Sequence, residues 1–401
     1  MIDYVEIYKL NEDGTLALFG VIDDFNSVIW KNTYYGVGTF EIYAPASSAN
    51  LNLLKAENYV ITPEGGDREV GIIERVEVTT DPEQGVMVAA TGRMAKSILD
   101  RRIIYTPIYD AAEGNTGYIW HCSAKTLSGK VDAAAALLVK ENAAQPSNAY
   151  PLYLKGDRRL PALGWSEEDG ASKFPETISV ETNTGDEDAE KQVTYKNLLT
   201  YTDGILEEYG LGAYLWLDRD TMKLHYRVFK GASRTMEEHP ESEPVIFSQE
   251  MDNLVTTDYV YDETNKKTTA LIGGEGEGTE RKCAFAYEWV SGMERRETFV
   301  DASSITTEAE EGQPAIDMQT YRRQLEAQGQ QTVAQSPAEE TLGGEMDITN
   351  SPLEYRRDFY VGDLVTIEDS ILGLSTPVRI LSITERQDDE GYNIDIEYGS
   401  K

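Results

Sequence analysis

The sequence predicts a mainly β fold with α insertions (α+β), in which two related small β-barrel domains carry inserted α/β domains. Three observations predict this class. Short segments of alternating apolar and polar residues recur at both ends of the chain, separated by turns that contain Gly or Pro. A stretch near the C-terminus repeats the pattern of an earlier one. Segments with helical spacing lie between these β regions.

Residues 1–105 are expected to form the first β-barrel domain. Turn residues at 11–14 and 35–38 separate pairs of alternating segments, which predicts two hairpins. Ser47 is a candidate N-cap for a short helix. The expected strands begin at Val5 and continue over 16–21, 27–30, 40–43, 59–62, 70–79 and 86–90.

Residues 106–195 are expected to form an inserted α/β domain. The Ala- and Leu-rich segment 131–144 predicts a helix that ends before Pro146. The acidic stretch 164–192 predicts a solvated loop or hairpin tip. A calcium site is disfavoured because the stretch lacks the spacing of acidic ligands found in calcium loops.

Residues 196–300 are expected to begin the second barrel and to carry an insertion. A helix over 196–209 is followed by Gly210, placed where a C-terminal glycine ends a helix. A hairpin over 213–229 follows, and then a strand pair formed by 253–261 and 268–273.

Residues 301–350 are expected to form a helical insertion, with a polar helix over 317–334. Residues 351–401 then complete the second barrel with strands over 364–368, 378–384 and 394–398.

Two segments, 57–92 (the first repeat) and 362–399 (the second repeat), share one order of elements. Each has a short strand, a longer strand, an acidic turn that closes on a glycine, and a final strand that ends on a glycine. Unrelated hairpins can share such a pattern, so strand pairing must decide whether the repeat is real. With two barrels per chain, three chains around a threefold axis would form a trimeric pseudo-sixfold ring.

The composition is strongly acidic. The 36 Lys and Arg residues against 71 Asp and Glu residues give a net charge of −35. This charge argues against a protein that grips nucleic-acid phosphates or docks on anionic lipid. A content of 24 Tyr, 5 Trp and 9 Phe favours a folded chain over a disordered one.

The amino-acid sequence shows no targeting signal and no cofactor motif. The N-terminus has no basic region followed by an apolar run, and no apolar run approaches the length of a membrane span. We therefore expect synthesis in a cytoplasm and no membrane anchor. Two cysteines are too few for a disulfide framework or a zinc site, so no metal or cofactor is expected.

The sequence offers no catalytic motif. None of the three histidines, His121, His225 and His239, lies in a metal-binding or nucleophile motif. The glycine-rich segment 273–278 lacks the Lys-Ser/Thr of a phosphate-binding loop, and its glutamates would repel phosphate. No catalytic residue is assigned, but a hydrolase that acts through carboxylates alone stays open.

Several ordered motifs resemble those of the siphophage Gp37-like tail proteins. The resemblance covers most of the chain and is weakest at 106–195 and 305–350. Its motifs include Phe247-Ser248 and Asn253-Leu254 before the glycine-rich segment. The structural motif positions that we single out are Trp30, Gly38, Phe40, Pro45, Gly71, Gly92, Arg93, Arg102, Gly210, Gly362, Asp363 and Glu385.

The resemblance implies a baseplate hub in the virion, similar to the N-terminal part of a tail-associated lysin or tail tip protein. Such hubs are homotrimers that join the tail tube and distal tail protein to tail fibre, receptor-binding or lytic tip proteins. The tape measure protein is a further candidate partner. Because Lys401 closely follows the last expected strand, we expect cell-wall cleavage and receptor binding on other chains.

Two questions stay open at this level. The acidic charge either lines a channel through which DNA passes without specific binding, or it only solubilises the outer surface. The alternatives to a hub are a cell-wall hydrolase and a receptor-binding tip. The latter would expose aromatic side chains, for which Trp120, Trp165 and Trp289 are candidates.

Overall fold

The computed structural model consists of two compact units, one formed by 1–178, 190–258 and 342–401 and the other by 179–189 and 259–341. We call these unit 1 and unit 2. The structure describes all residues except 63–65, 83–84, 109–120, 124, 147–157, 179–190, 194, 237–242, 255, 257, 288–289, 304, 308–316, 347–350, 371–372 and 401.

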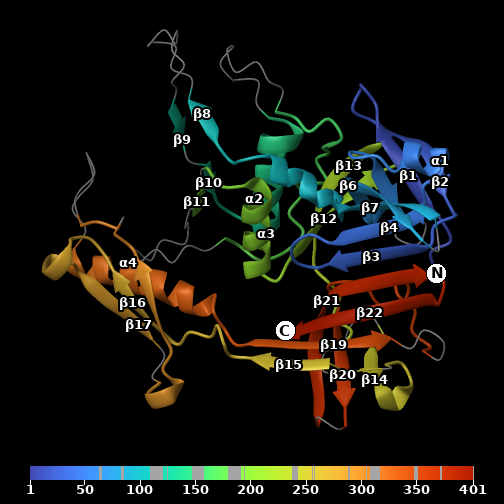
Figure 1. Ribbon diagram of the computed structural model, residues 1–401. Helices are drawn as coiled ribbons and strands as arrows, with labels where there is room; N and C mark the ends of the chain where they lie inside the picture. Colours follow the sequence, from blue (N-terminus) through green and yellow to red (C-terminus); the bar gives the residue numbers. More distant parts are fainter. Residues whose placement is uncertain are drawn as a thin grey trace, which may run out of the picture. The chain divides into compact units, whose positions relative to one another are not determined.

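Most strands of a thirteen-stranded sheet lie in unit 1, and the predicted mainly β class is confirmed (Figure 1). Its first seven strands are β1 (Val5–Leu10), β2 (Leu16–Ile22), β3 (Ser27–Thr33), β4 (Thr39–Pro45), β5 (Tyr59–Ile61), β6 (Val70–Asp81) and β7 (Gly85–Met94). The later ones are β14 (Ile246–Ser248), β15 (Asp258–Asp262), β19 (Glu339–Met346), β20 (Leu364–Asp369), β21 (Leu374–Asp388) and β22 (Gly391–Ser400). Through β15 and β19 the chain passes from one unit to the other.

The strand order is β15-β19-β22-β21-β3-β4-β7-β6-β5-β1-β2, with β20 beside β21 and β14 beside β20. The predicted hairpin of β3 and β4 therefore sits in the middle and joins the two repeats. Its strand β3 pairs with β21 of the second repeat, and β4 pairs with β7 of the first. Apolar residues that alternate along these strands fill one core beside each repeat.

Strand pairing agrees with the predicted repeat. In the first repeat the short strand β5 pairs with β6, and β6 pairs with β7. In the second, β20 pairs with β21, and β21 pairs with β22. Each long middle strand carries one β-bulge, at Glu74 in β6 and at Leu381 in β21. A shared bulge at the same place in both strands favours a true repeat over two unrelated hairpins.

Short helices and a helical layer complete unit 1. Helix α1 (Ser48–Leu53) begins at the predicted N-cap Ser47, whose hydroxyl accepts from the Asn50 amide. Helix α2 (Val131–Val139) continues as a π-helical turn to Ala144, as the predicted helix 131–144 requires. Helix α3 (Leu198–Glu208) ends before Gly210, whose φ of 68° is a left-handed value that favours glycine.

The predicted hairpin after Gly210 is present as β12 (Gly212–Asp218) and β13 (Lys223–Phe229). Two small sheets lie near α2 in the sequence. They consist of β8 (Thr106–Ile108) with β9 (His121–Ser123), and β10 (Lys125–Leu127) with β11 (Lys191–Val193). Short 3-10 helices cover Gly66–Arg68, Ala95–Arg101, Gln249–Met251, Gly278–Glu280 and Gly292–Glu294.

Unit 2 packs one helix on a three-stranded sheet. The sheet has the order β17 (Cys283–Tyr287), β16 (Thr269–Gly273), β18 (Glu297–Asp301), and helix α4 (Met318–Ala334) buries Tyr321 and Leu325 against it. The predicted pairing of 253–261 with 268–273 is wrong, because β15 pairs with β19 and β16 pairs with β17 and β18. Among the described residues, no helix is long and apolar enough to cross a membrane.

Candidate functional site: a buried junction between the repeats

An arginine joins the two repeats through a buried ion cluster. Arg356 lies just before the second repeat, and its Nε donates to Glu69 Oε1 of the first repeat at 3.0 Å. Its Nη1 donates to Glu385 Oε1 of the second repeat at 2.9 Å, and Nη2 contacts both carboxylates. The side chain of Glu385 is almost completely buried, and that of Arg356 is mostly buried. One guanidinium therefore bridges two carboxylates that are 316 residues apart in the sequence.

Aromatic side chains close the cluster. Trp30, which is opposite Glu385 in the β3–β21 ladder, donates from Nε1 to Glu69 Oε2 at 3.0 Å. Tyr355 donates to the other Glu69 oxygen at 3.2 Å, and Tyr392 donates to Glu385. Both carboxylates thus have hydrogen-bond partners besides Arg356, as buried charged groups require.

The charges of this cluster depend on one another. Burial raises the pKa of the Glu385 carboxyl, and the hydrogen bond and charge of Arg356 oppose that shift. Burial works to lower the pKa of Arg356, but the charges of Glu69 and Tyr355 and the hydrogen bonds to Glu385 and Glu69 together raise the pKa above its ordinary value. Arg356 therefore stays protonated in the folded chain. Because this close carboxylate pair is buried and bound to Arg356, it cannot act as the acid and base of a hydrolase.

A second buried centre surrounds Tyr34. Its hydroxyl donates to the Gly210 carbonyl at 2.8 Å, and burial raises its pKa to about 12. A Cβ added at Gly362 would lie 2.4 Å from the Tyr34 ring, so only glycine fits there. Arg379 lies over the Tyr34 ring and donates to the Gly362 carbonyl at 2.8 Å. Two motif glycines, Gly210 and Gly362, thus both contact Tyr34 in the loop of the β3–β4 hairpin.

Three further motif positions form the contact between β4, β6 and β7. The Phe40 ring lies against Gly71 and Gly92, where an added Cβ would come within 2.5 and 3.0 Å of ring atoms. Gly38 is close to the Lys31 carbonyl, and Pro45 ends β4 opposite Met87.

The remaining motif positions make polar contacts. Asp363 is buried and accepts from Arg234 Nε and the Ala232 amide, both at 2.8 Å. Arg93 is half exposed and donates twice to Glu74, the bulge residue, at 2.8 Å. Arg102 donates to backbone carbonyls, at 2.8 Å for Arg158. The twelve positions therefore lie at several separate buried contacts and on two partly exposed arginines, not in one cleft. Sequence reasoning missed Glu69 and Arg356, because nothing in their neighbourhood marks them as partners.

The acidic stretch is not uniformly solvated, which corrects the prediction for Asp169. Its side chain is buried and accepts from His225 Nδ1 at 2.6 Å and from the Ser166 amide at 2.7 Å. The other ring nitrogen of His225 lies 3.6 Å from Asp218. The hydroxyl of Thr221 donates to Asp218 at 2.6 Å and lies 3.4 Å from Nε2 of His225. The group is a structural tie between the loop and the β12–β13 hairpin.

Replacing Asp169 with asparagine is expected to flatten the acid dependence of stability. Burial works to raise the pKa of Asp169, but hydrogen bonds from His225 and Ser166 leave it below its ordinary value of 3.8. As the pH falls below that value, the unfolded chain binds the proton first, so the free energy of unfolding decreases. Urea titrations between pH 3 and 6 should show this loss in the wild type and a smaller one in Asp169→Asn. The variant should also lose about 1–3 kcal/mol at neutral pH. A variant at the exposed neighbour, Glu168→Gln, should keep the wild-type slope, and an unchanged slope in Asp169→Asn would contradict the assignment.

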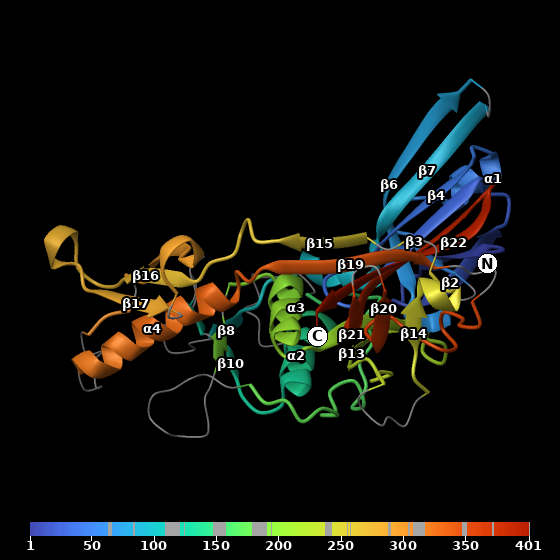
Figure 2. The same cartoon turned by 90° about the horizontal axis from the view of Figure 1, so that it is seen from below.

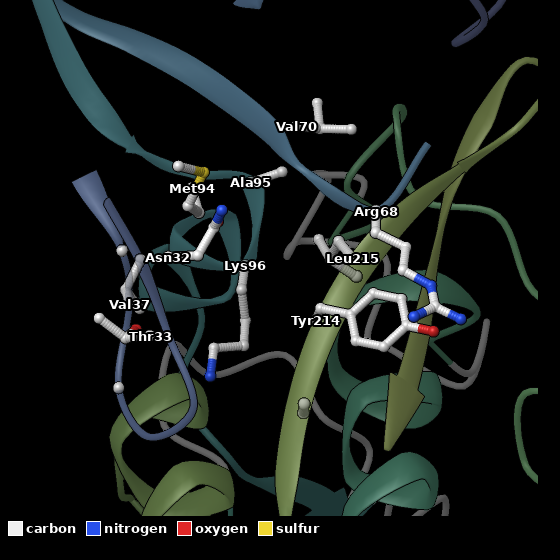
Figure 3. Close-up of a pocket in the computed structure, with 13 residues that line it drawn as sticks. Asn32, Thr33, Val37, Arg68, Val70, Met94, Ala95, Lys96, Tyr214 and Leu215 are labelled. Carbon is white, nitrogen blue, oxygen red and sulfur yellow. The ribbon is translucent and has the colours of Figure 1, made fainter. Parts of the chain in front are cut away.

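The described part of unit 1 contains cavities of different size. One of about 50 Å³ lies between the loop of the β3–β4 hairpin and β12, with Lys96 and Tyr214 in its lining (Figure 3). Lys96 is paired with Asp203 at 2.9 Å, and the Arg68 guanidinium lies over the Tyr214 ring. This space suits a few water molecules. A larger cavity, of about 540 Å³, has His225 in its lining, whose ring nitrogens both face carboxylates.

Other candidates from the sequence also have structural explanations. In the glycine-rich segment 273–278, the Glu275 carboxylate accepts from the Thr306 hydroxyl at 2.7 Å and from the Thr307 amide at 2.8 Å. It also pairs with Lys282, so this segment holds a hydrogen-bonded carboxylate and is not a phosphate-binding loop. Trp165 is partly buried, with Lys140 over its ring. Trp120, Trp289, His239 and 181–190 lie outside the described residues. Within the described part of the chain, no group of three His, Cys, Asp or Glu residues could hold a metal ion.

The chain is similar to several known structures. The tail protein from Neisseria meningitidis MC58 is 13% identical, with a TM-score of 0.50 and coverage of 99% of this chain and 97% of that one. The prophage MuSo2 43 kDa tail protein from Shewanella oneidensis is also 13% identical, with coverage of 99% and 98% and a TM-score of 0.49. Prophage tail protein gp18 from Listeria monocytogenes EGD-e is 13% identical, with coverage of 100% and 95% and a TM-score of 0.43. Among curated proteins, none matches this sequence.

The mostly β fold is shared with the tail protein from Neisseria meningitidis MC58, and comparison with family models gives the class of the chain: a phage tail protein. The model of the Siphovirus ReqiPepy6 Gp37-like protein family matches residues 4–400. The chain belongs to this family, which confirms the resemblance found in the sequence motifs.

Proposed function

We propose that the protein is a baseplate hub at the tip of the phage tail. It would assemble as a homotrimer that joins the sixfold tail tube and distal tail protein to threefold tip components. Tail fibre, receptor-binding and lytic tip proteins would be its partners on the distal side, with the tape measure protein a further candidate.

The observation that carries this proposal is the repeated strand arrangement within one chain. Both repeats have the same strand order and the same bulge, and the β3–β4 hairpin joins them in one sheet. Three chains would then present six similar β modules on one face while keeping threefold symmetry elsewhere. We propose 1–105 as the first barrel domain and 351–401 as the end of the second. The segments 106–195 and 301–350 supply insertions between them, and 196–300 begins the second barrel and carries a further insertion.

The acidic charge supports a role in DNA ejection. A net charge of −35 would repel phosphate groups if carboxylates line the centre of the ring. DNA would then pass through the channel without specific binding.

The mass of the purified protein tests this proposal. A homotrimer has three times the chain mass of 44.7 kDa, about 134 kDa. Light scattering should give this mass, and electron microscopy of the same sample should show rings with an open centre. Addition of the distal tail protein should produce a larger complex with sixfold features at one end. A protein that stays monomeric alone and with the distal tail protein would contradict the hub proposal.

A further inference from the structure

The two repeats differ in what covers the edge of their long middle strand. One edge of β21 pairs with β22, and the other pairs first with β20 and then, over Ser382–Gln387, with β3. One edge of β6 pairs with β7, and the other pairs with β5 over 70–72. From Arg75 onward, this second edge of β6 has no partner among the described strands. In Figure 2, β6 and β7 extend as a two-stranded arm beyond the other strands of unit 1.

The shared bulge defines which residues of the two strands correspond. Aligning Glu74 with Leu381 places Arg75–Asp81 of β6 on 382–388 of β21. Both segments end at the turn that leads into the last strand of the repeat. The open edge of β6 is therefore the counterpart of the edge of β21 that β3 covers.

Burial differs in the same way. Ile383 and Glu385 of β21 are fully buried, whereas their counterparts Val76 and Val78 are 36% and 52% exposed. In the β6–β7 ladder these two valines are opposite Ala90 and Val88, which belong to the core of the first repeat. The exposed valines thus extend the apolar face of that core onto an open strand edge. Such an edge readily takes up another strand.

The sheet also contains a counterpart of β3 that is terminal in the order of described strands. In the first repeat β3 pairs with β4, which pairs with β7; in the second, β15 pairs with β19, which pairs with β22. Because β15 and β3 each occupy the third position in these two orders, counted from β22 and β7, β15 is the equivalent of β3. Val28 and Trp30 of β3 are fully buried, but the three central residues of β15, Tyr259–Tyr261, are 41–55% exposed. In the order of described strands, β15 is terminal.

We propose that β15 of one chain adds as an antiparallel strand to the open edge of β6 in a second copy of this chain. This junction would repeat, between chains, the β3–β21 junction that already exists within the chain. In the β3–β21 register, Ser382 is opposite Thr33 at the end of β3. The corresponding register places Arg75 beside the C-terminal end of β15, where Asp262 supplies the opposite charge.

A second copy is the occupant because six strands separate β15 from β6 in the sheet of a single chain. The β15 edge of one chain would contact the β6 edge of the next, so the two chains use different surfaces and the interface is heterologous. Such interfaces form a closed ring when the rotation that relates neighbouring chains brings the last chain back to the first. The inference rests on the proposed homotrimer, in which three such junctions between chains would alternate with three within chains.

Disulfide trapping tests the junction directly. Cys122 and Cys283 are first replaced with serine, and single cysteines are placed at Val78 on β6 and at Tyr259, Val260 or Tyr261 on β15. When a β6 variant is mixed with the β15 variants under oxidising conditions, at least one pair should form a covalent dimer, because opposite residues in antiparallel strands lie within disulfide reach. Leu18 on the terminal strand β2, with exposure similar to Val78, is the control, and Leu18→Cys should form no dimer with the β15 variants.

A charge variant in the native cysteine background provides an independent test. Val78→Lys should convert most of the trimer to monomer at micromolar concentration. Phe299→Lys changes a similarly exposed side chain on unit 2 and should leave the trimer intact. A trimer that persists in Val78→Lys and gives no β6–β15 crosslink would overturn the strand junction while leaving the hub function in place. A wild type that is monomeric, with no crosslink, would overturn both.

Discussion

Replacing Arg356 with methionine is expected to lower the free energy of unfolding by about 3–5 kcal/mol, a large share of what holds a domain folded. The substitution keeps an unbranched side chain but leaves Glu69 and Glu385 facing each other without the guanidinium between them. Glu385 is fully buried, so its charge cannot be solvated instead. Urea unfolding monitored by tryptophan fluorescence reports on this region, because Trp30 is part of the cluster.

Arg357, the neighbour of Arg356 in the sequence, provides the matched control. Arg357 is exposed and pairs with Glu354 and Asp358 at the surface, so Arg357→Met should cost less than about 1 kcal/mol. Adding Glu69→Gln and Glu385→Gln to Arg356→Met should recover part of the loss, since the unpaired charges are removed. Equal stability losses in Arg356→Met and Arg357→Met would show that the buried cluster does not tie the repeats together.

Local patterns in the sequence predicted most individual elements. Alternation with a period of two is characteristic of a half-buried strand, and the segments 70–79 and 378–384 therefore predicted parts of β6 and β21. Capping residues act within one turn of their own position, which explains why Ser47 and Gly210 were found correctly. The repeat could also be predicted, because the first and second repeats contain the same kinds of strand and turn in the same order along the chain.

Contacts between distant segments could not be predicted in this way. Arg356, the partner of Glu69, lies 287 residues away in the sequence. The charged residues around Arg356 are typical of an exposed turn, so nothing local marks it as buried. Asp169 was assigned to a solvated face because its neighbours are acidic, yet His225 from another segment buries it. The false pairing of 253–261 with 268–273 had the same origin: adjacency in sequence suggested a hairpin, while β15 and β16 each found partners farther along the chain.

The second large effect is expected at Gly92, where alanine should cost about 3 kcal/mol. A Cβ at this position would lie 1.8 Å from the Ile72 carbonyl oxygen of the neighbouring strand. Backbone in a hydrogen-bonded ladder cannot rotate away as a side chain can, so β6 and β7 must separate to relieve the overlap. Urea unfolding measures the loss of stability. The same separation should lower the yield of the crosslink between Val78 and β15, because Gly92 lies at the base of the β6–β7 arm.

Gly399 closes the second repeat as Gly92 closes the first, and it is the natural control. A Cβ there would lie 2.4 Å from the end of the Leu381 side chain, which can adopt another rotamer. Gly399→Ala should therefore cost only about 1 kcal/mol and leave the β6–β15 crosslink unchanged. If the two alanine variants are equally stable, the close approach of β6 and β7 at Gly92 is not what fixes the arm. The open edge would then have to be held in place by the charged contacts of Arg93 with Glu74.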